Sequence, residues 1–226
     1  MLYTSQTRPV ESEYLDSITS LKFTADGQTL MQPDGRWDIA ILKRGDQVEV
    51  LRTGLTTRTV VYDHSAGDET LVISFKPSVF MPLMPGEVMR DEGVVLEKFG
   101  RQGFWIGTDV REIPTLENAD VFVEHLVRSG IVERNDLVDS VLAGQPKAMT
   151  ERTLQRHFLK TTGLTYKTFT VIERAQKAAS LLRMGQTATD VAFALGYSDQ
   201  AHMINSLKAI MGQTPGQIAR EAVPPG

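Results

Sequence analysis

Arginine and glutamine side chains gather on one face of a predicted helix in the C-terminal third of the 226-residue chain. Leu154 and Phe158 are apolar and recur at helical spacing in this segment. Because a helix turns about 100° per residue, Arg152 and Arg156 point nearly opposite to them, with Gln155 at the flank. Arginine can pair with guanine through two hydrogen bonds and glutamine with adenine, and both also bind phosphate. This face is therefore a candidate surface for reading double-stranded DNA.

A second segment repeats this arrangement forty-nine residues further along the chain. Met203, Leu207 and Ile210 show the apolar spacing of the first segment. Asparagine can read adenine, isoleucine can contact a thymine methyl group and lysine binds phosphate, so this less basic face also suits DNA. The residues that the same geometry turns outward are Ala201, Ile204, Asn205 and Lys208.

The two segments are copies of one helix–turn unit, because their ends match as well as their apolar faces. Thr150 is a suitable N-cap for the first copy, Ser198 and Asp199 supply the start of the second, and Gly163 and Gly212 are natural C-terminal stops. Taken alone, each polar face is the ordinary solvated side of an amphipathic helix. The repetition of caps, spacing and stops favours a shared functional role over that alternative.

Further predicted helices arrange the copies as helix-turn-helix units. Asp136–Leu142 precedes the first copy and Thr187–Leu195 the second, and in this plan the second helix of each pair enters the major groove. Tyr166–Met184 is predicted to be one connecting helix of 19 residues, roughly 28 Å long. That length would place the two recognition helices near the ~34 Å repeat of B-DNA. The inward residues of the connecting helix are Phe169, Ile172, Ala175, Ala179 and Leu182.

The distribution of charge separates the chain into two parts. The whole chain carries 24 basic and 28 acidic residues, a net charge of −4, which by itself disfavours a polyanionic partner. Residues 146–226 carry ten basic and five acidic residues, however, and the remainder carries 14 and 23. A segment of net +5 is thus joined to one of net −9, and we expect only the helical face to approach DNA.

The C-terminal residues resemble the DNA-binding domain of the AraC family of bacterial transcription regulators. The resemblance covers roughly Pro114 to Arg220 and rests on four separated motifs in the family's order. It implies seven helices, two helix-turn-helix units and promoter binding, with Thr214 as a cap and Pro215 at the first position of a helix. The matching stretches are residues 150–158 (TERTLQRHF), 174–182 (RAQKAASLL), 190–200 (DVAFALGYSDQ) and 212–215 (GQTP).

Two features depart from the family's pattern. The family usually has an arginine where this chain has Asn205, so the second unit is expected to bind more weakly or to read different bases. The turn of the first unit, Ala143–Met149, is longer than usual and contains Pro146. The helix before that turn is therefore expected to be short, which affects the angle at which Arg152 and Arg156 meet DNA.

The N-terminal half is predicted to be β structure. Short β-rich runs alternate with turn signals at an even spacing typical of an antiparallel barrel or sandwich. Residues such as Pro33-Asp34-Gly35 resemble turns of the small β-rich sensor domains found before some AraC-type units. The predicted fold class is α+β: a small β-barrel or sandwich at residues 1–110, then an all-α domain at residues 111–226 with two helix-turn-helix units joined by a long helix. The predicted strands are 18–23, 37–42, 47–52, 56–62 and 70–75.

The residue types argue against an enzyme. The chain has no cysteine, which excludes disulfides, thiolate metal sites and thiol-based sensing. A metal-binding barrel needs several histidines on one ion, yet His64 is alone in the β-rich half, and beside Asp63 it is expected to be a hydrogen-bonded surface residue. The sequence has no Gly-x-Ser-x-Gly motif and no phosphate-binding glycine-rich loop with lysine. No catalytic residue, metal or cofactor is therefore predicted.

A sensor domain needs a ligand site, and three residues are candidates for it. Trp37 and Trp105 could line an apolar pocket, and Arg36 could pair with an anionic effector. Aromatic residues more often pack in a core or an interface, and a surface arginine is usually solvated, so these simpler roles compete with ligand binding.

The sequence as a whole predicts a cytoplasmic, sequence-specific DNA-binding transcription regulator of the AraC type, under ligand control and without enzymatic activity. Double-stranded DNA is the predicted partner, and a small-molecule effector, RNA polymerase and a second copy of the chain are further candidates. No membrane contact is predicted, because no apolar run is long enough to span a bilayer. The alternative is a ligand-binding or enzymatic β-barrel whose helical half is a protein-interaction module. The predicted DNA-binding residues are Thr150, Arg152, Gln155, Arg156, Gln200, Ile204, Asn205 and Lys208.

Overall fold

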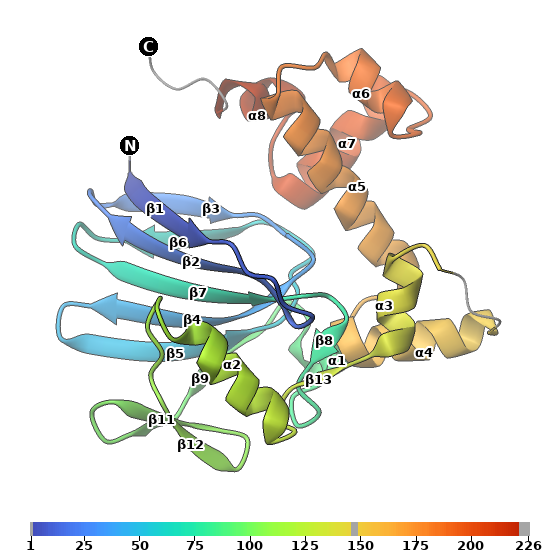
Figure 1. The fold of residues 1–226 in the computed structure, drawn as a ribbon. Helices are drawn as coiled ribbons and strands as arrows, with labels where there is room; N and C mark the ends of the chain where they lie inside the picture. Colours follow the sequence, from blue (N-terminus) through green and yellow to red (C-terminus); the bar gives the residue numbers. More distant parts are fainter. Residues whose placement is uncertain (1, 146–148, 222–226) are drawn as a thin grey trace. The chain divides into compact units, whose positions relative to one another are not determined.

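The computed structural model describes residues 2–145 and 149–221 (Figure 1). Contacts between residues divide the chain into two compact units, and each is described by itself. The first unit comprises Met1–Thr29, Arg36–Leu55 and Tyr62–Thr165. The second unit comprises Leu30–Gly35, Thr56–Val61 and Tyr166–Gly226. The domain boundary predicted between residues 110 and 111 stays a prediction.

A six-stranded antiparallel sheet forms the centre of the first unit, with the strand order β1-β2-β7-β4-β5-β9 (Figure 1). Its core side carries Ile18, Ile39 and Ile73, which are fully closed to solvent and come from three neighbouring strands. Ile39, Ala40 and Ile41 of β4 are buried in succession, so residues on both faces of the sheet are covered at this point. The strands are β1 (Tyr3–Arg8), β2 (Leu15–Phe23), β4 (Trp37–Arg44), β5 (Gln47–Thr53), β7 (Glu69–Phe75) and β9 (Gly93–Leu96).

Three smaller sheets accompany the main sheet in the part of the chain that the structure describes. Because β1 and β9 are the two open edges of the main sheet, that sheet is not closed into a barrel, and the sandwich form of the predicted fold class holds. The small sheets pair β3 (Gly27–Met31) with β6 (Val60–His64), β8 (Val79–Phe80) with β13 (Glu133–Arg134), and β10 (Lys98–Phe99) with β11 (Gly103–Ile106) and β12 (Asp109–Glu112).

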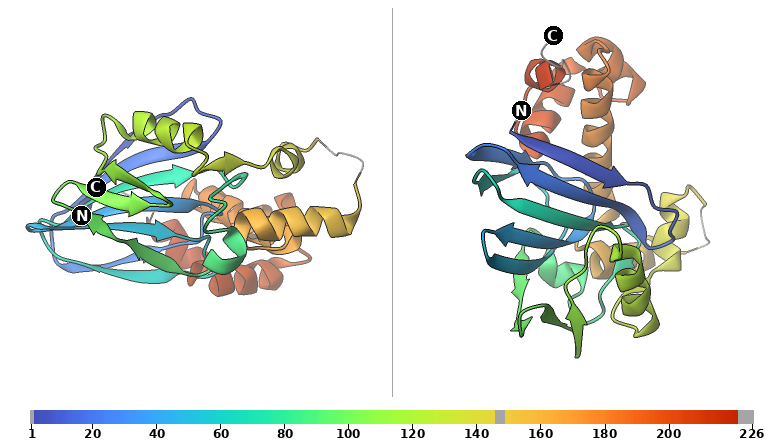
Figure 2. Two further views of the ribbon diagram at one scale, coloured as in Figure 1. Left: turned by 90° about the horizontal axis from the view of Figure 1, so that it is seen from below. Right: turned by 60° about the vertical axis from the view of Figure 1, so that its left-hand side comes forward.

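Helices follow the strands. A short helix, α1 (Gly86–Met89), precedes β9, and α2 (Ala119–Arg128) lies beside the main sheet (Figure 2). Phe122 of α2 packs against Phe104 of β11, with 6.0 Å between the ring centroids. Seven helices lie between residues 119 and 221 of the described chain, the number that the family resemblance implies. Those after α2 are α3 (Asp136–Leu142), α4 (Glu151–Thr162), α5 (Tyr166–Arg183), α6 (Ala188–Ala194), α7 (Gln200–Met211) and α8 (Pro215–Glu221).

The predicted strand at residues 56–62 is wrong over its first half. Strand β6 begins only at Val60, because the backbone amide of Thr59 is bonded to the carbonyl of Ile210 instead of a neighbouring strand. The predictions also omit β1 and β3. Five of the six β1 residues are polar, so the strand has no apolar alternation, and it is recognised only through its pairing with β2.

His64 is a second correction, because it is buried and not on the surface. Its ring stacks on Phe23 at a centroid distance of 4.0 Å. Its Nδ1 donates to the Ala25 carbonyl at 3.0 Å, and its Nε2 lies 3.2 Å from the Thr29 hydroxyl. Both ring nitrogens are thus satisfied inside the first unit, as buried polar atoms require.

The helices of residues 2–145 and 149–221 were compared with the length and hydropathy that a bilayer crossing requires. None of them meets both conditions.

Candidate nucleic-acid interface

Helix α4 carries the first polar face that the sequence assigns to DNA. Its N-cap is Thr150, whose hydroxyl accepts a hydrogen bond from the Thr153 amide at 3.2 Å. This bond satisfies one of the first-turn N–H groups that lack a partner within the helix. Phe158 is fully buried, whereas Arg152 and Arg156 are exposed, as predicted. The helix therefore holds both guanidinium groups on its solvent side.

Local contacts fix the flank and the end of α4. Gln155 is exposed and donates from Nε2 to the Glu151 carboxylate at 3.3 Å. Gly163 takes the left-handed conformation, with φ of 76°, and its amide donates to the Leu159 carbonyl at 2.9 Å. This conformation favours glycine, so the helix ends where the sequence predicts.

Helix α7 carries the second face. Its N-cap is Asp199, whose carboxylate accepts a hydrogen bond from the His202 amide at 2.7 Å. That bond, together with one from the Ser198 hydroxyl, lowers the pKa of Asp199. Gly212 ends the helix with φ of 67°. Met203, Leu207 and Ile210 are buried as predicted, Gln200, Ala201, Asn205 and Lys208 are exposed, and Ile204 is half-buried.

The leading helices are tied to their recognition helices by capping side chains and turn residues. Asn135 caps α3 by accepting bonds from the amides of Leu137 and Val138 at 3.2 and 3.3 Å. The amide group of the same side chain donates to the Thr161 hydroxyl of α4 at 2.8 Å. One residue therefore both begins α3 and fixes its angle to α4.

The second pair is joined in a different way. Thr187 caps α6 by accepting from the Asp190 amide at 3.2 Å, and its hydroxyl donates to the Asp190 carboxylate at 2.7 Å. In a standard capping box the acidic side chain would instead accept from the backbone amide of the cap. Tyr197, in the turn between α6 and α7, meets the ring of His202 edge-on at 5.3 Å.

Helix α5 is the support of the second unit. Its 18 residues give a length of roughly 27 Å. The guanidinium of Arg174 lies 4.4 Å from the ring centroid of Tyr197, a cation–π contact that joins α5 to the turn before α7. The residues predicted to face inward, Phe169, Ile172, Ala175, Ala179 and Leu182, are all buried.

Residues 147–221 match the family model described as a helix-turn-helix domain. The C-terminal part of the chain is an AraC-type helix-turn-helix domain. The match confirms the prediction of a DNA-binding transcription regulator. No curated protein matches the chain.

Solved structures of ToxT from Vibrio cholerae resemble the whole chain. The P21 crystal form is 9% identical, with a TM-score of 0.44 and coverage of 98% of both chains. The O395 structure is also 9% identical, with a TM-score of 0.45 and the same coverage. Wild-type ToxT with bound unsaturated fatty acid is 8% identical, with a TM-score of 0.38 and coverage of 96% of this chain and 91% of that chain. These values are too low to carry an argument about this chain.

The departures of the AraC-type domain from its family can be located in the structure. Asn205, the position at which the family resemblance implies an arginine, is exposed on α7. Helix α3 has seven residues, and so does α6, so the leading helices are of equal length. The turn predicted at Ala143–Met149 contains residues 146–148, including Pro146, which lie outside the described residues.

The three candidate ligand residues lie in different surroundings in the first unit. Trp37 is 1% exposed, stacks on Phe75 at 4.0 Å, and donates from its indole nitrogen to the Val79 carbonyl at 2.6 Å. Trp105 is 40% exposed on β11. Arg36 forms an ion pair with Asp16 at 2.7 Å. Ligand binding by these residues stays a prediction, and Trp37 serves the core of the first unit.

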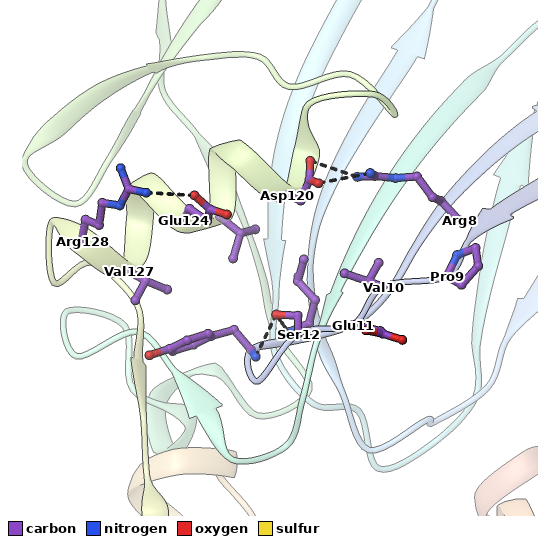
Figure 3. A pocket seen from close by; sticks show the side chains of 12 residues that line it. Arg8, Pro9, Val10, Glu11, Ser12, Asp120, Glu124, Val127 and Arg128 are labelled. Atoms are coloured by element: carbon purple, nitrogen blue, oxygen red, sulfur yellow. Dashed lines mark hydrogen bonds and ion pairs between the residues drawn. The ribbon is translucent and has the colours of Figure 1, made fainter.

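A cleft that the sequence does not predict lies between α2 and the loop after β1 (Figure 3). It has a volume of about 470 Å³. Arg8 pairs with Asp120 at 3.1 Å along its rim, and Arg128 pairs with Glu124 at 3.0 Å (Figure 3). Arg8 and Asp120 are 112 positions apart in the sequence, so no local motif marks the site. Its apolar wall consists of Val10, Leu15, Val123 and Val127.

Proposed function

We propose that this regulator binds promoter DNA through the exposed faces of α4 and α7, with α4 as the stronger contact. The observation that carries the proposal is the repeated unit: two capped helices of twelve residues, each ending at a left-handed glycine. Arg152 and Arg156 give the α4 face two guanidinium groups, whereas Lys208 is the basic residue on the α7 face. Arginine forms the commonest specific contact with guanine, so the first face should dominate affinity and specificity.

The other predicted DNA-binding residues are assigned to phosphate or base contacts from their side-chain chemistry and their place on the helices. Thr150 and Gln200 stand at the first turns of α4 and α7, where side chains reach phosphate or base edges. Gln155 and Asn205 carry amide groups that match adenine. Ile204 is half-buried and offers a methyl surface to thymine.

Charge supports one orientation on the duplex. Residues 146–226 carry a net charge of +5 and the rest of the chain −9. The acidic part is repelled by the phosphates, so the AraC-type domain approaches DNA with its basic face forward.

We also propose that the β-rich part senses a small molecule. The cleft of about 470 Å³ beside α2 is within the size range of small-molecule sites. It offers an apolar wall beside two ion pairs, Arg8 with Asp120 and Arg128 with Glu124, which suit an amphipathic ligand with a polar end that can donate and accept hydrogen bonds. Cytoplasmic location, contact with RNA polymerase and a homodimer, which would raise affinity for paired sites, belong to the same proposal. The proposal assigns the chain no enzymatic reaction.

Selection of bound sites from random duplex DNA, with and without pools of small molecules, tests the proposal. We expect recovered sites with two half-sites, an affinity that falls steeply with salt because bound phosphates release counterions, and a change in affinity with one of the pools. Absence of binding to duplex DNA at low salt would contradict DNA recognition. It would then favour the alternative of a ligand-binding β protein whose helices bind another protein.

A further inference from the structure

The last turn of α4 is in direct contact with the backbone of α1. A side-chain carbon on Gly86 would lie 2.4 Å from the Gly163 nitrogen and 2.7 Å from the Thr161 carbonyl oxygen. A side-chain carbon on Gly163 would lie 2.2 Å from the Gly86 carbonyl oxygen. Such distances leave no room for a side chain, so the contact requires glycine at both positions. Within the first unit, α1 therefore holds the C-terminal end of the first recognition helix.

The last turn of α7 is held at the equivalent place in the second unit. The amide and the hydroxyl of Thr59 both donate to the Ile210 carbonyl, at 3.2 and 3.1 Å. Carbonyl groups in the last turn of a helix lack the usual partner inside it, and Thr59 supplies two donors to such a group. Thr59 also lies next to Gly212, because a side-chain carbon there would be 3.6 Å from the threonine. Gly163 and Gly212 are the matching ends of the internal repeat.

A second loop, residues 30–35, contacts α5 in the second unit. Gln176 of α5 donates to the Pro33 carbonyl at 2.6 Å, and Arg183 donates to the Gln32 side chain at 2.9 Å. Pro33 itself is buried. Residues 30–35 and 56–61 thus belong by their contacts to the helices, although they come from the β-rich part of the sequence.

The contact on α4 is rigidly supported from β5. The buried guanidinium of Arg52 donates to the Met84 carbonyl at 3.1 Å, two residues before Gly86. The Gly54 amide donates to the Glu92 carbonyl at 2.8 Å, and the Asp91 amide donates to the carbonyl of the residue after Gly54 at 3.0 Å. The segment that contains α1 is therefore fixed to the end of β5, and the chain reaches Thr59 five residues after Gly54.

We propose that Gly86 and Thr59 are positioning residues for DNA recognition, which set the inclination of α4 and α7 by holding their C-terminal ends. In helix-turn-helix proteins the N-terminal residues of the recognition helix contact the bases. A contact at the opposite end changes the angle of docking without occupying the DNA face. Because the α1 segment is hydrogen-bonded to the end of β5 and the chain continues from that end to Thr59, a shift of that strand end would act on both helices. This inference rests on the proposed function.

The test uses the full chain with Thr59→Val and Gly86→Ala, and hydroxyl-radical footprints on a selected two-half-site duplex. Arg152→Ala and Asn205→Ala assign each half-site to its helix. Thr59→Val removes a hydroxyl bond and keeps the shape, and we expect roughly a threefold to tenfold loss of protection at the α7 half-site alone. Gly86→Ala should give a loss of at least that size at the α4 half-site alone.

Matched controls are Thr4→Val on the exposed surface of β1 and Gly93→Ala on β9, where a side-chain carbon meets only the Leu51 side chain at 3.4 Å. Both controls should leave the footprint unchanged. Unchanged footprints for Thr59→Val and Gly86→Ala, or equal losses at both half-sites, would overturn the inference. If Gly86→Ala fails to fold, Thr59→Val alone decides. If the unaltered chain binds no duplex at all, it is the proposed function that fails.

Discussion

The two helix-turn-helix units of this protein have the same design and different surroundings. Each has a leading helix of seven residues and a recognition helix of twelve residues that ends at a left-handed glycine. The first pair packs in the unit that contains the sheet, where Lys160 of α4 lies 5.2 Å from the Phe80 ring of β8. The second pair packs on α5. The repeat therefore fixes local helix geometry, whereas the surroundings decide how tightly each recognition helix is held.

Alanine at the two stop glycines, Gly163 and Gly212, should lower the free energy of unfolding by different amounts, and this is the largest difference that we expect between the units. Alanine in the left-handed conformation costs about 1–2 kcal/mol, so Gly212→Ala should lower the free energy of unfolding by that amount. Gly163→Ala adds a clash with the Gly86 backbone, and overpacking of this kind costs a further ~1–3 kcal/mol. Chemical denaturation of the two variants measures the difference. Equal losses would show that α1 moves away from the new side chain with no loss of stability. The C-terminal end of α4 would then be no more tightly packed than that of α7.

The second-largest difference should appear in DNA affinity, when residues on the outward faces of α4 and α7 are replaced by alanine. Arg152→Ala or Arg156→Ala should cost ~1–3 kcal/mol at particular base pairs, about 5-fold to 150-fold in affinity. Asn205→Ala and Lys208→Ala should cost less than about 1 kcal/mol, because the α7 face lacks the family's arginine. Titrations against a selected site and single-base variants of it separate these cases. An equal loss on every sequence would assign the arginines to phosphate contacts only.

An arginine at position 205 should reduce the difference in DNA affinity between the α4 face and the α7 face. Asn205 is exposed on α7, so Asn205→Arg adds a long side chain without disturbing the core. We expect affinity for a duplex with guanine at the facing position to rise by about 1 kcal/mol, and the salt dependence to steepen. Asn205→Gln serves as the control, since it lengthens the side chain without charge. A gain that does not depend on sequence would indicate a phosphate contact.

The helices of this fold could be predicted from the sequence because their signals are local. Asp136–Leu142 coincides with α3, the predicted cap Thr150 accepts a first-turn amide, and of the predicted start Ser198-Asp199 it is Asp199 that caps α7. Burial of Phe158 and Leu207 follows from the helical period alone. Each of these features depends on residues within about one or two turns of one another.

The contacts that hold the recognition helices could not be predicted in this way. Thr59 and Ile210 are separated by 151 positions, and no sequence pattern near either residue predicts its contact with the other. The sequence predicts Gly163 as a helix stop, but the second role of Gly163 against Gly86 depends on backbone from a distant segment. His64 shows the same limit, because the residues beside it in sequence do not reveal that its ring stacks on Phe23.

The smallest difference that we expect lies in the stability of the first turns of α4 and α7, and it depends on pH because of their N-caps. Thr150 caps α4 with a hydroxyl that does not titrate, whereas Asp199 caps α7 with a carboxylate. The pKa of Asp199 is lowered, chiefly because the His202 amide donates to it and also because the Ser198 hydroxyl does. A group with a lowered folded pKa stabilises the fold fully above its unfolded pKa, and that stabilisation is lost as the pH falls through the folded pKa.

Acidification should therefore loosen the first turn of α7 and leave that of α4 unchanged. Amide chemical shifts and exchange protection of His202 and Thr153 report the two caps separately. The His202 signal should titrate with the Asp199 carboxylate, and Asp199→Asn, which keeps an acceptor without a charge, should abolish that titration. Parallel loss of protection at His202 and Thr153 would mean that acid opens both recognition helices together, so that the cap of α7 has no pH response of its own.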